Sequence, residues 1–213
     1  MMAADQPALA PPTRDLSGFP AVDLDKGQRV ARSHAVTNTA WWFASTPASG
    51  GGRFDLGSPC GTCYIADNVE VAVRERLRET IVASGVVSPL LAERFAVSVF
   101  TMPRAWRCAH IGLAKAARFG VTRELAALAP SQYPLSRQWA SAFAATGFEG
   151  IRYGARFTPG QANAWALFGR AGGDEAPQPM VDEVIPGPEA CRQVGLRVTP
   201  IPRFASLTVS RTS

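Results

Sequence analysis

The sequence predicts a single α+β domain. Apolar runs of strand length follow one another along the 213-residue chain, and helical patterns are inserted singly between them, which favours α+β over regular alternation of strand and helix. The length suits one domain with one core, and no segment repeats. We expect a mobile leader over residues 1–20, which are rich in Ala and Pro, a folded domain over 21–202 and a tail over 203–213.

Strands are predicted where β-branched and aromatic residues gather between turn residues. Residues 29–34 alternate weakly and precede an aromatic anchor at 41–43, and the run 62–66 follows a glycine-containing turn. The runs 94–102 and 105–111 have a similar composition. We therefore expect four strands in the first half of the chain.

The helix that follows residue 66 carries two carboxylates with different surroundings. Asp67 and Glu70 have capping-box spacing, so we expect a helix over 68–84 that Gly85 ends, with Glu70 capping its first turn. Helical periodicity places Glu75 on a stripe between valines. Periodicity alone leaves Glu75 either as the carboxylate of a covered site or as an ordinary residue at an amphipathic edge.

The second half of the chain combines helices with further strands. Glycine and proline mark the ends of these elements, as Gly120, Pro134 and Gly147 do. In order, we expect one or two helices over 113–128, a helix over 134–146, strands at 150–153 and 164–168, a loop at 172–179, a strand, a short helix at 188–193 and a final strand at 196–201.

Composition argues against several classes of protein. The net charge of +5 comes almost wholly from arginine, since Lys26 and Lys115 are the only lysines, and arginine suits phosphate and carboxylate recognition. No basic block of about five residues appears, which argues against direct nucleic-acid binding. No apolar run reaches about 18 residues and the start lacks a secretion signal, so we expect a cytoplasmic protein without a membrane span.

The four cysteines do not predict a metal site. Cys60 and Cys63 have C-x-x-C spacing, but a zinc ribbon needs a second such pair, and Cys108 and Cys191 lie far apart. A redox pair would begin a helix, whereas this pair leads into a strand. We therefore expect reduced thiols and no bound metal.

Several short motifs, taken in order, resemble the RES-domain family over about residues 29–169. They are Arg32-Ser33-His34, Trp42-Phe43, Gly52-Arg53-Phe54-Asp55, GTCYIA at 61–66, Glu75 in the helix, Tyr133, Gln138-Trp139-Ala140, GFEGIRY at 147–153 and the strand at 164–168. Each motif alone is weak. Their shared order and spacing make the resemblance fairly specific.

The resemblance implies an ADP-ribosyltransferase-like fold, with a mixed β core and inserted helices, and an activity that consumes NAD. It implies catalytic roles for Glu75 and Arg32. The positions it implies for NAD binding are Arg53, Tyr64, His34, Tyr133, Tyr153 and Ala155. Ala155 stands where the family has a serine, so we expect slow NAD cleavage unless another hydroxyl, such as that of Ser136, takes over.

The residue types suit this chemistry. Cleavage of the bond between nicotinamide and ribose builds positive charge on the ribose, which the Glu75 carboxylate can stabilise. Arg32 and Arg53 can hold a pyrophosphate through their bidentate forks, and the Tyr64 ring can face the nicotinamide. His34 either reaches the substrate or is a hydrogen-bonded core histidine, and the other residues also have ordinary structural readings. No dinucleotide-binding G-x-G-x-x-G appears, so we expect NAD as substrate and no bound cofactor.

The resemblance also implies a protein partner. RES proteins look like toxins of bacterial toxin–antitoxin pairs, in which an antitoxin with an Xre-type helix-turn-helix covers the active site. A homodimer stays open, as does the acceptor of ADP-ribose, which is water, phosphate or a protein side chain. Two other hypotheses remain: a catalytically weakened RES-like protein that acts by partner binding, motivated by Ala155, and a small basic nucleic-acid-binding module.

Overall fold

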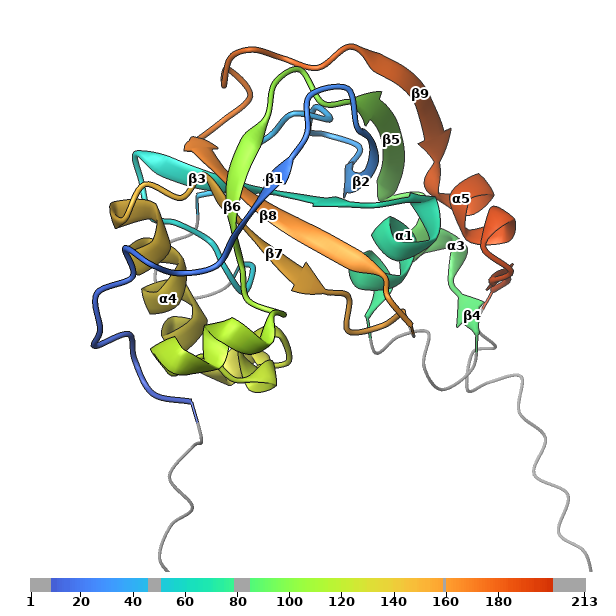
Figure 1. The fold of residues 1–213 in the computed structure, drawn as a ribbon. Helices are drawn as coiled ribbons and strands as arrows, with labels where there is room; N and C mark the ends of the chain where they lie inside the picture. The colour runs from blue at the N-terminus through green and yellow to red at the C-terminus, as the bar shows by residue number, and fades with distance from the viewer. Residues whose placement is uncertain (1–8, 46–50, 79–84, 159, 201–213) are drawn as a thin grey trace, which may run out of the picture.

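The computed structural model describes residues 9–45, 51–78, 85–158 and 160–200 (Figure 1). Its strands are β1 (Ala21–Leu24), β2 (Arg29–Ala35), β3 (Cys60–Ala66), β4 (Val86–Val87), β5 (Phe95–Thr101), β6 (Trp106–His110), β7 (Gly150–Gly154), β8 (Asn163–Arg170), β9 (Val181–Pro186) and β10 (Arg197–Val198). Its helices are α1 (Val69–Leu77), α3 (Pro89–Ala92), α4 (Tyr133–Ala145), α5 (Gly187–Gln193) and the 3-10 helices η1 (Ala114–Phe119), η2 (Arg123–Ala126) and η3 (Pro130–Gln132). Across the described ranges, no helix is long and apolar enough to cross a membrane.

One mixed sheet forms the centre of the domain. Its strand order over the described residues is β1-β6-β7-β8-β3-β2-β5-β9. Neighbouring strands run antiparallel, apart from β6 and β7, which run parallel. A separate parallel pair joins β4 to β10. A mixed sheet with helices inserted between its strands confirms the predicted single α+β domain.

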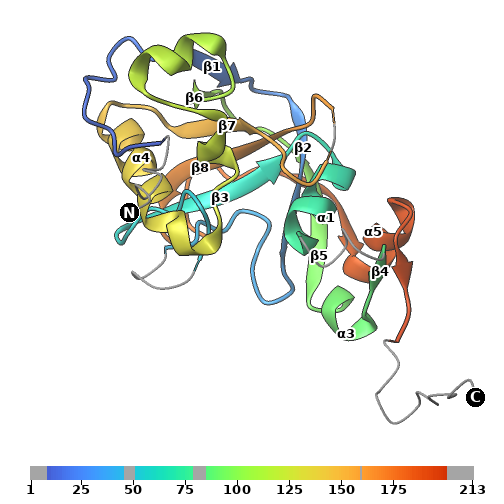
Figure 2. The same ribbon diagram turned by 90° about the horizontal axis from the view of Figure 1, so that it is seen from below.

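The helices form two groups at opposite ends of the sheet. In both ribbon views, α4 and the 3-10 helices lie at one end, and α1, α3 and α5 lie at the other (Figures 1 and 2). Each group buries its own apolar cluster: Trp139 and Phe143 of α4 belong to one, and Val73 of α1 and Cys191 of α5 belong to the other. The sheet connects the two clusters, and β3 runs from one group of helices toward the other (Figure 1).

The sheet is almost divided between β3 and β2. In the described part of the chain these strands share one residue pair, Ala31 with Ala66. By contrast, β2 pairs with β5 along its whole length, and β3 pairs with β8 along its whole length. Beyond Ala31 the two strands diverge, so that residues 32–35 and 62–65 are not paired with each other. The divergence leaves a space within the sheet.

The start of α1 differs from the capping-box prediction. Asn68, and not Asp67, is the N-cap, and its side chain accepts a hydrogen bond from Val71 N at 3.0 Å. Asp67 instead accepts hydrogen bonds from Trp165 Nε1 at 2.9 Å and Asn163 Nδ2 at 3.0 Å. Asp67 and Asn68 are both residue types that can cap a helix. Because Asp67 is bound to side chains of β8, Asn68 caps α1.

The end of α1 also differs from the prediction. The helix ends at Leu77, because Arg78 takes a φ of 49°, which is not helical. The remainder of the predicted helix, 79–84, lies outside the described residues. Within α1, Glu70 does not cap the first turn but forms an ion pair with Arg74 at 2.8 Å.

Residues 9–20 pack onto the domain, which corrects the predicted mobile leader. Leu9, Leu16 and Phe19 are 1%, 3% and 3% exposed and belong to the cluster around α4. Trp139 Nε1 also donates a hydrogen bond to Ala10 O at 3.0 Å. These apolar residues are spaced irregularly among prolines, so no periodicity predicted their burial. The rest of the leader, 1–8, and the C-terminal residues 201–213 lie outside the described residues.

Most other elements lie where the sequence predicts them. The short elements β1, β4, α3 and η3 were not predicted, and the segment 113–128 forms 3-10 helices that are separated at Gly120, whose φ is 85°. The final strand is shorter than predicted, since β10 covers residues 197–198 alone. These differences lie away from the diverging strands.

Candidate active site

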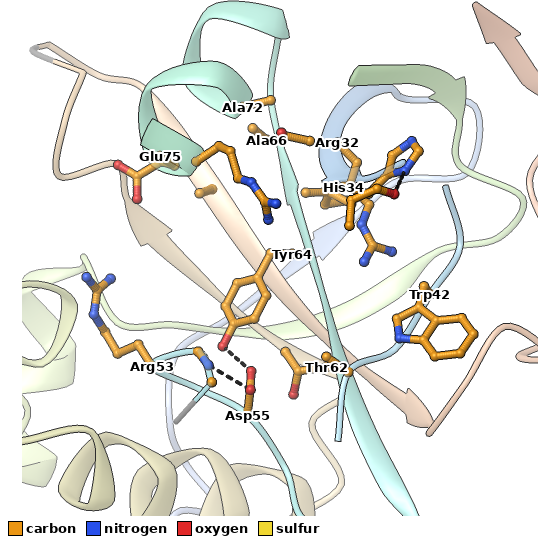
Figure 3. Close-up of a pocket in the computed structure, with 18 of the residues that line it drawn as sticks. Arg32, His34, Trp42, Arg53, Asp55, Thr62, Tyr64, Ala66, Ala72 and Glu75 are labelled. Atoms are coloured by element: carbon orange, nitrogen blue, oxygen red, sulfur yellow. Dashed lines mark hydrogen bonds between the residues drawn. The ribbon is translucent and has the colours of Figure 1, made fainter. Parts of the chain in front are cut away.

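The space between the diverging strands is a pocket of about 560 Å³ (Figure 3). Residues of β2, β3, α1 and the loop at 51–55 line it, together with Tyr133 and Tyr153. The predicted site residues that line it are Arg32, His34, Arg53, Tyr64, Glu75, Tyr133 and Tyr153. Ala155 is not among the lining residues. The fold therefore brings most of the predicted site together from distant parts of the sequence.

Arg53 enters the pocket among aromatic rings. It is 8% exposed, and its guanidinium carbon lies 5.9, 5.8 and 6.0 Å from the ring centres of Phe54, Tyr133 and Tyr153. Its Nε is buried without a hydrogen-bond partner, and no carboxylate of the described residues forms a salt bridge with it. Burial without a counter-charge is costly for a cation, so this guanidinium is suited to bind an anion.

The loop that carries Arg53 is held by polar side chains. The Asp55 carboxylate accepts hydrogen bonds from Gly52 N at 2.7 Å and from the Tyr64 hydroxyl at 2.7 Å. The same hydroxyl accepts a hydrogen bond from Phe54 N at 2.8 Å. Burial, and then the Asp55 charge, raise the pKa of Tyr64 well above its usual value, so the hydroxyl keeps its proton. The hydroxyl of Tyr64 is therefore committed to the loop, which the sequence did not predict.

Arg32 brings a second buried guanidinium from β2. It is 6% exposed, and its Nη1 donates hydrogen bonds to Ala40 O at 2.9 Å and to Cys63 Sγ at 2.8 Å. Its Nε is buried without a partner, and no carboxylate of the described ranges forms a salt bridge with it. The pocket thus contains two buried cations, one on β2 and one on the loop that leads into β3.

Glu75 is held on the pocket wall by the loop after β7. Its Oε1 accepts a hydrogen bond from Phe157 N at 2.9 Å. Burial, and then the Glu75 charge, raise the pKa of Tyr153. In Figure 3, Glu75 and Arg53 lie toward one end of the pocket and Trp42 lies toward the other, with Tyr64 between them. Glu75 and Arg53 therefore lie on the same side of the pocket.

The His34 side chain is fully engaged with protein groups. Its Nδ1 lies 3.0 Å from Ala35 O, which only accepts, so Nδ1 carries the proton. Its Nε2 lies 2.8 Å from Ser98 Oγ and accepts the hydroxyl proton. Burial lowers the pKa of His34, in agreement with this neutral tautomer. The structure therefore favours the hydrogen-bonded core histidine, although His34 does lie on the pocket wall beside Arg32.

Neither Ala155, at the position of the family serine, nor Ser136, the hydroxyl considered in its place, lines the pocket. Ala155 lies outside the pocket lining, where its N donates to Ala162 O at 2.9 Å and its side chain packs against the cluster of α1 and α5. Ser136 is fully buried, and its hydroxyl points to Arg53 O at 2.6 Å and Tyr133 O at 3.1 Å. Ser136 is therefore bound to the loop and does not supply a hydroxyl to the pocket.

Several lining residues were not predicted as site residues from the sequence, among them Arg76, Arg78 and Trp42. Burial, and then the charges of Arg78 and Arg32, lower the pKa of Arg76, so these guanidiniums lie near one another. Their spacing after Glu75 was visible in the sequence. The predicted helix continued past Arg78, whereas the chain leaves the helix at this residue, so the position of Arg78 at the pocket was not predicted.

The C-x-x-C pair is divided by the sheet. Cys60 is exposed at the start of β3, whereas Cys63 is buried next to Arg32, because residues an odd number apart on a strand point to opposite faces. All of the cysteines are free. In the described part of the chain, no cluster of His, Cys, Asp and Glu could hold a metal ion.

A thiol reagent is expected to modify Cys60 alone in the native protein. Cys63, Cys108 and Cys191 are buried, and burial raises the pKa of each thiol, which lowers the fraction of reactive thiolate. Intact-mass measurement should give one rapid adduct in native protein and one on every cysteine after unfolding. Cys60→Ser should abolish the rapid adduct. Several rapid adducts in native protein would contradict the described burial.

Two comparisons with known proteins agree with this architecture. A family model described as the RES domain matches residues 27–186. A chain in the crystal structure of the M. tuberculosis MbcT-MbcA toxin-antitoxin complex has a similar fold, with a TM-score of 0.52 and 12% sequence identity over 81% of this chain and 91% of that chain. At this identity the likeness concerns the fold alone. No curated protein matches the sequence.

Proposed function

Because this chain belongs to the RES-domain family, we propose that it consumes NAD by cleaving the bond between nicotinamide and ribose. The observation that carries the proposal is the content of the pocket. Two buried arginines that form no salt bridge with a described carboxylate, Arg32 and Arg53, share one cavity with the carboxylate of Glu75. NAD has the complementary charges, with two phosphate groups between its riboses and a positive nicotinamide ring at one end.

The chemistry follows from the position of each charge. When the bond between ribose C1 and the nicotinamide nitrogen breaks, its electron pair leaves with the nicotinamide, which becomes neutral. The ribose is left with an oxocarbenium-like positive charge, which Glu75 stabilises. Arg32 and Arg53 bind the pyrophosphate and so hold the reacting ribose near this carboxylate. The acceptor then forms a new bond to ribose C1.

The aromatic residues separate the two ends of the substrate. Tyr133 and Tyr153 lie near Arg53, and Tyr153 is near enough to Glu75 for its pKa to respond to that charge. Their rings supply apolar surface at the end where the bond breaks. The Trp42 indole lies toward the other end and offers a surface for the adenine (Figure 3). This placement directs the nicotinamide toward Glu75.

The protein is further proposed to be the toxin of a toxin–antitoxin pair in the cytoplasm. The similar fold in the MbcT-MbcA toxin-antitoxin complex supports this role. The family resemblance supports an antitoxin with an Xre-type helix-turn-helix as the partner. The arginines Arg76 and Arg78, which line the pocket, offer positive charge to such a partner.

Nicotinamide release tests the enzymatic proposal directly. Purified protein incubated with NAD should release nicotinamide, measured by chromatography, and expression without a partner should stop bacterial growth as cellular NAD falls. The physical reason is that continuous cleavage drains a pool on which growth depends. Normal growth with unchanged NAD, together with no nicotinamide from purified protein, would contradict the proposal and favour a protein that acts by partner binding.

A further inference from the structure

The loop at 52–54 has no regular secondary structure, yet side chains bind its backbone at every residue. Gly52 N donates to Asp55, and Phe54 N donates to the Tyr64 hydroxyl. Three carbonyls in a row accept side-chain donors: Gly52 O from Arg137 Nε at 3.1 Å, Arg53 O from Ser136 Oγ at 2.6 Å and Phe54 O from Thr62 Oγ1 at 2.9 Å. These donors belong to α4 and β3, so both elements fix the loop.

Asp55 and Tyr64 form the centre of this arrangement. Asp55 is 4% exposed, and each of its oxygens accepts a hydrogen bond: Oδ2 from the Gly52 amide and Oδ1 from the Tyr64 hydroxyl. Since the Tyr64 hydroxyl donates to Asp55 and accepts from Phe54 N, both of its hydrogen-bonding capacities are used. The couple therefore fixes the amides on either side of Arg53.

The fit at Gly52 shows how closely this couple packs on the loop. A Cβ at this position would overlap the Tyr64 hydroxyl oxygen and lie 2.5 Å from Asp55 Oδ1. Glycine therefore lets the backbone approach both groups. The contacts given by the described residues to the Arg53 guanidinium are aromatic rings, by contrast, so its direction depends on the backbone that carries it.

We propose that Asp55 and Tyr64 are positioning residues, which act by holding the 52–54 backbone so that the Arg53 guanidinium points into the pocket. Tyr64 then contributes through its hydroxyl and not through its ring. The inference rests on the proposed function for the identity of the anion, a pyrophosphate. Loss of the couple lets the loop move and reduces the share of molecules in which Arg53 meets that anion.

A double-mutant cycle with Arg53 tests the proposal. Tyr64→Phe removes the hydroxyl and keeps the ring, and Arg53→Met removes the cation. We expect Tyr64→Phe to weaken ADP-ribose binding about tenfold by calorimetry and to raise KM for NAD by a similar factor, because a lost hydrogen bond to a charged group has this magnitude. With Met in place of Arg53, the same substitution should change binding less than about twofold, since it has nothing left to position.

The outcomes separate positioning from other roles. Equal losses from Tyr64→Phe with and without Arg53 would overturn the proposal, because the hydroxyl would then act independently of the cation. Unchanged ADP-ribose binding in Tyr64→Phe would overturn it as well, because Tyr64 would then contribute to binding through its ring and not through its hydroxyl. Asp55→Asn, which keeps one acceptor oxygen, repeats the cycle if Tyr64→Phe fails to fold. Thr146→Val, which removes a hydroxyl bound to Ala142 O outside the pocket, should leave binding unchanged.

The choice of ADP-ribose as probe separates this inference from the proposed function. If wild-type protein binds ADP-ribose but releases no nicotinamide, the proposed cleavage fails while the cycle still decides the positioning role. If NAD is cleaved and the cycle is additive, the positioning role fails while the cleavage stands. Wild-type protein that binds no ADP-ribose would overturn the positioning of Arg53 for a pyrophosphate.

Discussion

Glu75→Gln is expected to lower nicotinamide release at least about a hundredfold while the protein stays folded. Loss of one electrostatic group aimed at a developing charge costs a factor of about 10² to 10³ in related chemistry. Gln keeps the oxygen that accepts the hydrogen bond from Phe157 N, so the loop after β7 stays anchored. The measurement is kcat/KM for nicotinamide release, with circular dichroism and thermal unfolding to check the fold.

Glu70→Gln is the matched control for this substitution. Glu70 lies on the same helix, and its side chain is 51% exposed in an ion pair with Arg74. Exposed pairs of this kind contribute about 0.5 kcal/mol or less, so we expect almost unchanged stability and activity within about twofold of wild type. Equal loss of activity in the two variants would show that charge on the helix, and not a carboxylate in the pocket, supports the reaction.

Arg32→Met is expected to weaken ADP-ribose binding about a hundredfold. Met fills similar space but removes the charged fork, and each hydrogen bond to a charged group is worth about 1.5 to 3 kcal/mol, so loss of a bidentate contact gives this factor. Trp42 lines the pocket while Trp41 is buried, so ligand binding can be followed by tryptophan fluorescence as well as by calorimetry. Thermal unfolding of the same samples shows whether Ala40 O tolerates the loss of its donor.

Arg29→Met changes the net charge by the same amount on the same strand. Its side chain is 66% exposed and lies 4.0 Å from Glu183, outside the pocket lining. We expect ADP-ribose binding within about twofold of wild type, because an exposed pair contributes little and lies apart from the site. A similar weakening in both variants would mean that the general positive field of the protein, and not the buried fork, attracts the ligand.

The strands were predictable because a strand-forming composition is a property of residues that are neighbours in the sequence. β-branched and aromatic runs between turn residues located β2, β3, β5 and β8 within a residue or two. The order of these strands in the sheet was not predictable, because pairing joins segments that are distant in the sequence. The single pair between Ala31 and Ala66 is a property of backbone direction, and no residue type reports it.

The site residues were predictable where they belong to the motifs shared with the RES-domain family. The resemblance selected Arg32, Arg53 and Glu75, and all three line one pocket. Their roles in the reaction stay predictions. Periodicity alone did not decide between the two readings of Glu75, which lines the pocket, whereas Glu70 forms an exposed ion pair.

The unpredicted contacts of the site share a physical cause, which is that polar side chains bind partners brought near only by folding. The hydrogen bond from the Tyr64 hydroxyl to Asp55, nine residues earlier, was not predicted. Ser136 was considered as a replacement for the family serine, but its hydroxyl donates a hydrogen bond to Arg53 O. Such partners become apparent only when the chain is folded, because each side chain has several acceptable partners and the final one depends on distance.

The single residue pair between β2 and β3 has a consequence for how the domain holds together. Hydrogen-bonded rungs usually make a sheet unfold as one unit, but here the β2-β5-β9 part and the rest of the sheet meet at one rung. Arg32 belongs to one part, and the loop of Arg53 leads into the other. A dinucleotide bound by both arginines would link the two parts of the sheet, and opening either part would then also release the ligand. The bound substrate would thus add a link between two parts of the sheet that, over the described residues, share one backbone pair, so that the two parts would unfold together.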